Sequence, residues 1–369
     1  MTSVVSERTT FQQIAEIIGE TFSVNAASIK LETTAHDVEG WDSVTHVHLL
    51  LALEDHFQVE LPAEIVLKCR NVGELADIVS RRVEPTARGA NVIIFGNCQA
   101  DMMTGQLNYL FKRWNKVQFH HLLSFCHPVT GWAKLSDEVL ESADFLWQQH
   151  DDQVEFPYKD RLPPSCRRIV FPSLDFNLLW PFAGTDPRNK PKLPDHPFGL
   201  LAYGDVVALQ VVRDGMTGKA GLRCYLERSR ARLARMSMAR LEEIEFARLG
   251  QREARCDVVM SDFIRASFRT VPAFFTWNHP AGRALTELMK RLMIASDLWD
   301  PDPQSVMAGD MAYCADHWEP LSSFELPIHP LVAEKVGLEW YDPDHRYRTP
   351  FGLVTHDEYI EHYIEGDAA

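Results

Sequence analysis

The sequence predicts an all-α four-helix bundle followed by a mixed α/β domain with a small parallel sheet and many helices. A length of 369 residues with 46% hydrophobic content suits two domains with substantial cores. Apolar residues recur at helical spacing in residues 1–84, whereas short strand patterns alternate with helix-length segments in residues 91–369. Proline, glycine and small residues in 85–90 indicate a linker between the two domains.

Four helices are expected in the first domain. The first covers residues 10–22, where apolar residues recur every three or four positions. A polar loop over 23–42 follows, and Asp42, a good N-cap, starts the second helix. The second helix carries a broad apolar stripe, formed by Val44, Val47, Leu50, Leu51, Leu53 and Phe57. A short helix near 63–69 and a last helix over 72–82 complete the bundle.

A serine follows the predicted N-cap directly. The segment Gly40–Ser43 reads Gly-Trp-Asp-Ser and places a hydroxyl near the first turn of the second helix, facing solvent. Residues 1–88 hold 14 acidic and 7 basic residues, so their net charge of −7 suits docking on basic enzyme surfaces. Taken alone, the Asp-Ser pair is also compatible with an ordinary capped helix start.

The helix order, the Asp-Ser pair and the Val72–Leu75 start of the last helix resemble the acyl or peptidyl carrier protein family. The resemblance covers most of residues 1–84, and Val44 departs from the leucine that usually follows the serine. It implies that Ser43 carries a covalent 4′-phosphopantetheine. A phosphopantetheinyl transferase would attach this group, and an acyl-loading enzyme would charge it.

Four strands of the second domain are expected to form the parallel sheet, at residues 91–95, 117–121, 143–147 and 168–171. Ligands of such sheets bind beyond the carboxyl ends of the strands. Candidate ligand-binding residues at those ends are Cys98, Gln148, Gln149, His150 and Ser173. Further elements are expected as helices at 203–214, 222–248 and 282–295 and a short strand at 274–276.

The long helix predicted at 222–248 is rich in arginine. Its basic residues include Arg228, Arg230, Arg232, Arg235, Arg240 and Arg248, against four glutamates. One interpretation is a solvated charged helix. The other is a basic face that docks the acidic first domain or holds phosphates.

Cys98 is the best candidate for a nucleophile, and His279 for a base. Cys98 follows a glycine turn at a helix N-terminus, where the helix dipole lowers a thiol pKa and N–H groups after Gly96 can receive an oxyanion. His279 lies in an Asn-His-Pro turn that ends a predicted strand. Three carboxylates are possible orienting acids for this histidine, namely Asp205, Asp262 and Asp310. The alternatives are a buried structural cysteine and a structural histidine turn.

Five short motifs occur in order through the second domain. They are Gly96-Asn97-Cys98-Gln99, Phe171–Leu174, Trp277–Pro280, Ile328–Pro330 and Thr355–Tyr359. Together they resemble the WcbI family of capsular polysaccharide biosynthesis proteins, which are viewed as acetyltransferases that bind coenzyme A. The resemblance implies that Cys98 and His279 lie in the active region. It also implies that coenzyme A or acyl-coenzyme A is bound by Gly96, Asn97, Gln99 and Asn278.

The two resemblances predict an acyltransferase that uses a phosphopantetheine-bound thioester, either on Ser43 or on coenzyme A. The acyl group passes directly, or through Cys98, to a hydroxyl or amine of a small-molecule or sugar acceptor that His279 deprotonates. The pathway would be polysaccharide or secondary-metabolite biosynthesis. One alternative is a thioesterase that uses water, and another is a non-catalytic carrier and recognition platform.

Composition excludes several other classes. The net charge of −15 and pI near 5.4 argue against nucleic acid as a partner. No 18-residue apolar run predicts a transmembrane helix, and the N-terminus lacks a signal-peptide pattern. Seven cysteines without paired spacing predict reduced thiols in a cytoplasm. No zinc motif and no Gly-x-Gly-x-x-Gly after a predicted strand occurs, so neither a metal site nor an oxidoreductase is expected.

Overall fold

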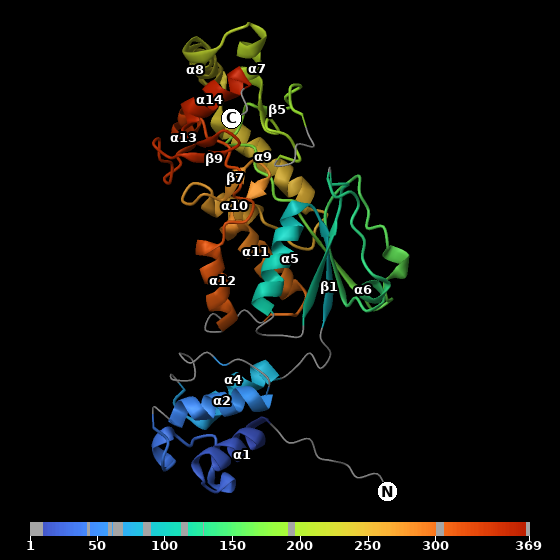
Figure 1. Cartoon of the computed structure of the whole chain (residues 1–369), viewed down its shortest axis with the longest axis vertical. Coiled ribbons are helices and arrows are strands. Elements are labelled where there is room, and N and C mark those ends of the chain that lie inside the picture. The colour runs from blue at the N-terminus through green and yellow to red at the C-terminus, as the bar shows by residue number, and fades with distance from the viewer. Residues whose placement is uncertain are drawn as a thin grey trace. The chain divides into compact units, whose positions relative to one another are not determined.

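The computed structural model describes residues 10–42, 45–57, 61, 69–83, 90–111, 117–127, 129–190, 196–299 and 306–366. The chain divides into two compact units, a smaller one with the helices up to residue 90 and a larger one with most of residues 91–369 (Figure 1). The predicted linker at 85–90 lies outside the described residues except for Ala90.

The first unit is helical, as predicted. Its described helices are α1 (Thr10–Phe22), α2 (Thr45–Phe57) and α4 (Val72–Val83), with short 3₁₀ turns at Ala26–Ser28 and Ala35–Asp37. The first, second and last predicted helices are therefore confirmed. The third, expected near 63–69, falls almost entirely outside the described residues.

The apolar stripe on α2 is narrower than the sequence suggested. Leu49, Leu50 and Leu53 are buried in a core shared with α1 and α4. Val47 and Leu51 are 49% and 56% exposed, so their assignment to the core was wrong. Only one face of α2 packs against the core. Val47 and Leu51 each lie two positions from a buried leucine, so their side chains are on the opposite face of the helix.

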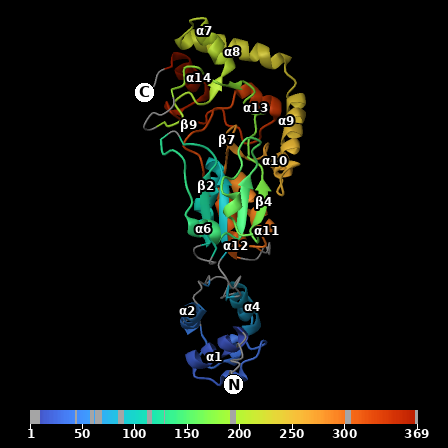
Figure 2. The same ribbon diagram turned by 90° about the vertical axis from the view of Figure 1, so that its right-hand side faces the viewer.

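The second unit contains a four-stranded sheet in the order β2-β1-β3-β4, near α6 (Asp137–Glu141) and α11 (Gly282–Ala295) (Figure 2). The strands are β1 (Asn91–Gly96), β2 (Gln118–Leu123), β3 (Phe145–Gln149) and β4 (Arg167–Phe171). β3 runs parallel to both β1 and β4, with Ile94 opposite Trp147 and Trp147 opposite Ile169. The predicted parallel sheet is confirmed, with strand ends shifted by one or two residues.

The order of the strands reverses between β1 and β3. The chain leaves β1 through helix α5 (Cys98–Phe111) to reach β2 on one side, and β3 lies on the other side. Crossovers that depart in opposite directions leave a crevice at the carboxyl ends of the two central strands. The turn after β1 and the end of β3 therefore define the place where a ligand site is expected.

The predicted long helix at 222–248 is two helices, α8 (Gly218–Arg235) and α9 (Met238–Glu253). The side chain of Ser237 accepts a hydrogen bond from the Arg240 N–H, so it caps a new helix start. The predicted helix at 203–214 is also shorter, as α7 (Val206–Arg213), because Gly204–Asp205 pairs as strand β6 with β5 (Ala183–Gly184).

The hairpin of β7 (Phe274–Thr276) and β8 (His279–Pro280) confirms the predicted short strand, and α11 (Gly282–Ala295) confirms the helix after it. The remaining elements are α6 (Asp137–Glu141), η3 (Lys159–Arg161), α10 (Ser261–Ser267), α12 (Val306–His317), α13 (Pro330–Val336), β9 (Tyr347–Thr349), β10 (Gly352–Val354) and α14 (His356–Glu365). Throughout the described ranges, every helix is too short or too polar to cross a membrane.

Candidate active site at the carboxyl end of the sheet

The turn after β1 requires glycine. A Cβ atom on Gly96 would lie 2.8 Å from the Ala100 Cβ and 2.9 Å from the Gln149 Oε1. The next residue, Asn97, starts α5, because its Oδ1 accepts a hydrogen bond of 2.9 Å from the Gln99 N–H. This tight turn places Cys98 at the first position of α5, as the sequence predicted.

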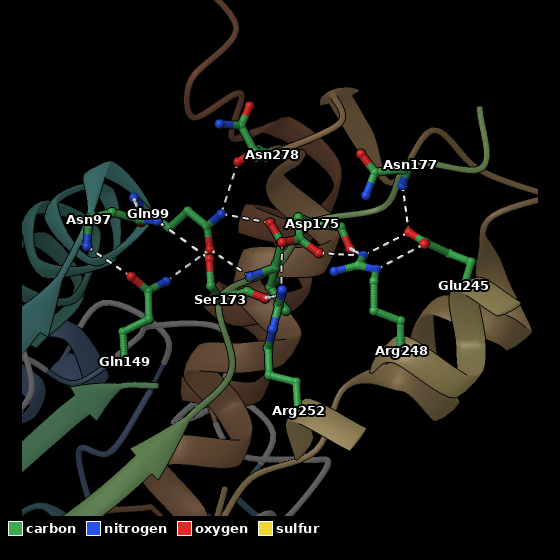
Figure 3. Close-up of polar contacts among 11 residues, drawn as sticks. Asn97, Gln99, Gln149, Ser173, Asp175, Asn177, Glu245, Arg248, Arg252 and Asn278 are labelled. Atoms are coloured by element: carbon green, nitrogen blue, oxygen red, sulfur yellow. Dashed lines mark hydrogen bonds and ion pairs between the residues drawn. The ribbon is translucent and has the colours of Figure 1, made fainter. Parts of the chain in front are cut away.

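A buried pair of glutamines joins the turn to the rest of the sheet edge (Figure 3). The Gln149 Oε1 accepts a hydrogen bond of 2.9 Å from the Asn97 N–H, and the Gln149 amide donates to the Gln99 Oε1 at 3.2 Å. Gln99 is fully buried, and its amide donates to the carbonyls of Leu174 (2.7 Å) and Asn278 (2.9 Å). Gln99 thus connects the start of α5 to β3, to the segment after β4 and to the β7–β8 hairpin.

The segment after β4 is held by charged groups from α9. Arg252 donates to the Ser173 carbonyl and to the Asp175 carboxylate at 2.9 and 2.8 Å, and Arg248 pairs with Asp175 and Glu245 (Figure 3). The positive charge of Arg248 is already paired with two carboxylates, so it is not available to bind an acidic partner surface. For this arginine, the solvated-helix and docking interpretations both give way to a structural role.

The β7–β8 turn presents Asn278 and His279 beside Tyr203. The Tyr203 hydroxyl donates to the Asn278 Oδ1 at 3.0 Å and lies 3.2 Å from the His279 Nε2. The Thr276 hydroxyl also donates to the Asn278 Oδ1, at 2.9 Å. Two donors on one oxygen fix the amide orientation, and within the described residues the Asn278 NH₂ group has no partner. Asn278 therefore offers free donors at this edge.

Cys98 is partly buried and forms no disulfide. Burial raises the pKa of the Cys98 thiol to about 11, although the backbone N–H groups of Cys98 and Gln99 act in the opposite direction. The prediction that the helix start lowers this pKa was wrong, because desolvation of the thiolate outweighs the helix-terminal donors. At neutral pH the thiol is protonated.

Two of the backbone donors expected to stabilise an oxyanion are occupied. The Asn97 N–H donates to Gln149, and the Gln99 N–H donates to the Asn97 side chain. They act in building the turn, so the expectation of a free row of N–H groups after Gly96 was wrong for these two. The structure instead leaves the Asn278 amide available as a donor.

Burial lowers the pKa of His279 to about 4, so its ring is neutral near pH 7. In the described part of the chain, no carboxylate hydrogen-bonds to this ring, and no hydrogen bond joins it to the Cys98 thiol. Of the proposed orienting acids, Asp205 caps α7 and Asp262 pairs with Arg291. The tyrosine at 203, which the sequence interpretation placed in a helix, is the ring's side-chain partner instead.

The first unit shows the predicted cap. The Asp42 Oδ1 accepts a hydrogen bond of 2.9 Å from the Thr45 N–H, and the Asp42 carbonyl accepts one of 2.9 Å from the His46 N–H. Asp42 thus has both interactions of an N-cap residue. Ser43, the predicted attachment site, lies outside the described residues.

The helical first unit and the parallel sheet with a cysteine turn at its switch point define a two-part protein, a small helical domain joined to an α/β domain. Comparison with known proteins gives each part a family. Residues 91–301 match the family described as polysaccharide biosynthesis enzyme WcbI, and residues 12–79 match the phosphopantetheine attachment site family. The chain belongs to the WcbI family and carries an acyl carrier protein domain at its N-terminal end.

Individual proteins and a solved structure match the same two parts of the chain. An acyl carrier protein of Clostridium acetobutylicum is 32% identical over 74 residues, which are 20% of this chain and 96% of that protein. One from Clostridium perfringens is 34% identical over 74 residues, 20% of this chain and 97% of that protein. A solved structure of WcbI matches with a TM-score of 0.56 and 18% identity, covering 76% of this chain and 91% of that chain. That structure is described as the native protein without a disulfide bond between coenzyme A and one of its cysteines.

Proposed function

We propose that residues 91–369 form an acyltransferase that takes an acyl group from a phosphopantetheine thioester and passes it to a hydroxyl or amine. In this proposal residues 1–84 are the carrier domain, 85–90 the linker, and Ser43 the attachment site. The observation that carries the proposal is the fusion itself: one chain joins an acyl carrier domain to a WcbI family domain. Both coenzyme A and a charged carrier end in the same arm, so one pocket suits either.

The side chains at the sheet edge fit the end of such an arm. Cys98 is partly exposed at the start of α5, and the WcbI structure is described in terms of coenzyme A and a cysteine. The free NH₂ group of Asn278 is placed to donate to a thioester carbonyl, where negative charge develops during transfer. Gly96, Asn97 and Gln99 shape the turn on which these groups depend.

His279 is the base in this proposal. Its neutral ring takes the proton of the acceptor hydroxyl or amine while the acceptor attacks the thioester carbon. The carbon–sulfur bond then breaks, and the arm leaves as a thiol after receiving a proton. The high pKa of Cys98 and its lack of a hydrogen bond to His279 favour direct transfer over an acyl-cysteine intermediate.

The first experiment addresses the carrier domain. Intact-mass spectrometry after co-expression with a phosphopantetheinyl transferase should show the mass gain of one arm, and Ser43→Ala should abolish it. An unmodified wild-type protein, or a modified Ser43→Ala variant, would contradict the assignment. The Ser43→Ala protein also serves for calorimetry with coenzyme A, because no tethered arm competes for the site.

The second experiment addresses the reaction. The arm is charged with an acyl group, and mass spectrometry follows its loss with and without small hydroxyl and amine acceptors. Acceptor-dependent loss supports a transferase, whereas equally fast loss in buffer alone indicates a thioesterase. Loss that persists in a Cys98→Ala, His279→Gln double variant indicates a non-catalytic platform. Full activity in Cys98→Ala alone would exclude the covalent route.

A further role of the fusion concerns concentration. Fusion to a carrier domain on the same chain raises the effective concentration of a tethered arm, to the millimolar range where the connection is short. We therefore expect the loading enzyme, rather than diffusion of acyl-coenzyme A, to set which acyl group is transferred. None of the seven cysteines, all of which lie in the described ranges, forms a disulfide, which suits a reducing cytoplasm, and we propose this as the location.

A further inference from the structure

A small cavity lies in the second unit and is lined in part by Tyr203. Its volume is about 40 Å³, and its apolar walls include Trp180, Phe182 and Leu326. A single water needs about 10–15 Å³ of such space, so the cavity has room for about three water-sized groups. The Tyr203 ring lines it, while the Tyr203 hydroxyl contacts His279 at 3.2 Å. The cavity therefore borders a residue that contacts the candidate base.

Several polar side chains of the cavity wall have structural partners. The Tyr225 hydroxyl donates to the Asp205 Oδ2 at 3.0 Å, and the Asp205 Oδ1 caps α7. The His329 Nδ1 accepts from the Leu331 N–H at 3.1 Å, so its Nε2 carries the proton and donates to the Ser229 hydroxyl at 2.9 Å. These groups are satisfied without a ligand.

Two polar side chains of the wall are different. His356 and Tyr359 lie three residues apart on α14, so they share one face of that helix. The His356 side chain is 7% exposed, and its Nδ1 lies 2.8 Å from the Asp357 carboxylate. Across the described residues, neither the His356 Nε2 nor the Tyr359 hydroxyl has a hydrogen-bond partner. Buried polar groups are rarely left in this state, so both point to a ligand in the cavity.

The chemistry of the two groups selects the ligand. The Asp357 carboxylate accepts the Nδ1–H of His356, so the Nε2 is the ring nitrogen left for a ligand. The Tyr359 hydroxyl is able to donate. An alcohol group is able to hydrogen-bond to both side chains at once, because its hydroxyl donates to the His356 Nε2 and accepts from the Tyr359 hydroxyl. The apolar walls then pack against the carbon that bears it.

We propose that this cavity binds one hydroxyl-bearing arm, such as a hydroxymethyl group, of the acyl acceptor. This inference rests on the proposed function and narrows its acceptor to a polyhydroxylated compound. One hydroxyl is anchored by His356 and Tyr359, and another reaches His279, which contacts the Tyr203 hydroxyl. The subsite requires no acidic or basic group on the acceptor, since both anchors form hydrogen bonds with a hydroxyl.

The test measures binding without acyl transfer. The full chain is labelled with ¹⁵N-histidine and titrated with ethylene glycol, and the Nε2 resonance of His356 is assigned with a His356→Gln variant. We expect a saturable shift of this resonance toward the hydrogen-bonded value, and no shift of His329, whose ring nitrogens are already bonded. 1,2-Dimethoxyethane, which has the same skeleton without hydroxyl groups, should produce no saturable shift.

Tyr359→Phe is the matched variant, since it removes the hydroxyl and breaks no hydrogen bond within the described structure. It should weaken ethylene glycol binding about fivefold to tenfold, the usual effect of one hydrogen bond. Unchanged coenzyme A binding shows that the variant is folded. A linear shift without saturation, an equal response to 1,2-dimethoxyethane, or unchanged affinity in Tyr359→Phe would each overturn the proposal.

The outcome is separable from that of the proposed function. If the charged arm never transfers its acyl group, the acyltransferase proposal fails while the titration still decides whether the cavity binds a hydroxyl group. If transfer to glycerol occurs, Tyr359→Phe should raise the KM for glycerol about fivefold to tenfold with little change in kcat, because the hydroxyl acts in binding. A change in kcat alone would contradict an anchoring role.

Discussion

Replacing Gln149 with methionine should loosen the Cys98 turn, whereas the same change at its neighbour Gln148 should not. Both glutamines lie on β3 and are buried, with 5% and 6% exposure. Gln149 bonds to the Asn97 N–H and to Gln99, whereas the Gln148 side chain has no hydrogen bond among the described residues. Methionine keeps the length and the unbranched shape, so the comparison isolates the amide group.

The magnitude follows from the bonds removed. Gln149→Met leaves the part-buried Asn97 N–H without its acceptor, which costs about 1–3 kcal/mol. The Gln99 Oε1 also accepts a hydrogen bond of 3.0 Å from the Leu174 N–H, which the variant keeps. Losing the bond from Gln149 to Gln99 therefore costs less free energy than losing the bond to Asn97. A net value of about 2 kcal/mol corresponds to a change of about 30-fold in a local opening equilibrium.

Hydrogen exchange by mass spectrometry on the full chain measures this opening. The reporters are the amides of Ala100 and Asp101, which bond to the Asn97 carbonyl in the first turn of α5. They should exchange about 30-fold faster in Gln149→Met and less than threefold faster in Gln148→Met. Equal acceleration in the two variants would refute the reasoning, because it would mean that burial of an amide, rather than its bond to the turn, decides stability.

Three further outcomes are expected. Alkylation of Cys98 by iodoacetamide should rise about tenfold per pH unit from pH 7 and continue to rise past pH 9, because burial raises its pKa to about 11; a plateau by pH 8 would contradict this. Asp42→Ala should destabilise the carrier domain by about 0.5–2 kcal/mol in urea unfolding, whereas Asp42→Asn, which keeps a capping oxygen, should cost much less. Burial lowers the pKa of His279 to about 4 and that of His329 to about 3. On acidification these histidines therefore take up protons at a higher pH in the unfolded chain than in the folded chain. Stability should be complete above about pH 6.5 and fall below it by at most about 1.4 kcal/mol per pH unit for each histidine, and the fall should be shallower in His279→Gln.

Local patterns in the sequence predicted much of the architecture. The apolar runs that became β1, β3 and β4 are short, bounded by turns and followed by polar residues, so both their type and their functional ends were predictable. The Asp42 cap was predictable for the same reason, since an N-cap depends on residues only three or four positions away. The break in the long helix was missed because Ser237 is its only strong local signal.

Contacts between distant segments were not predictable. Tyr203 was assigned to a helix, and nothing near it in the chain indicates a partner 76 residues away at His279. The direction of the Cys98 pKa shift was wrong for a related reason. Position at a helix start is visible in the sequence, whereas the packing that desolvates the thiol comes from several other segments.

The fully buried amide of Gln99 bonds to carbonyls 75 and 179 residues further along the chain. A ribosome-bound chain that ends before Asn278 therefore cannot complete the surroundings of Cys98, however well its first strands have paired. Synthesis proceeds from the N-terminus at about 5–20 residues per second, so the carrier domain is finished about 10–40 seconds before Asn278 is made. During that interval the carrier domain is complete while the surroundings of Cys98 are not.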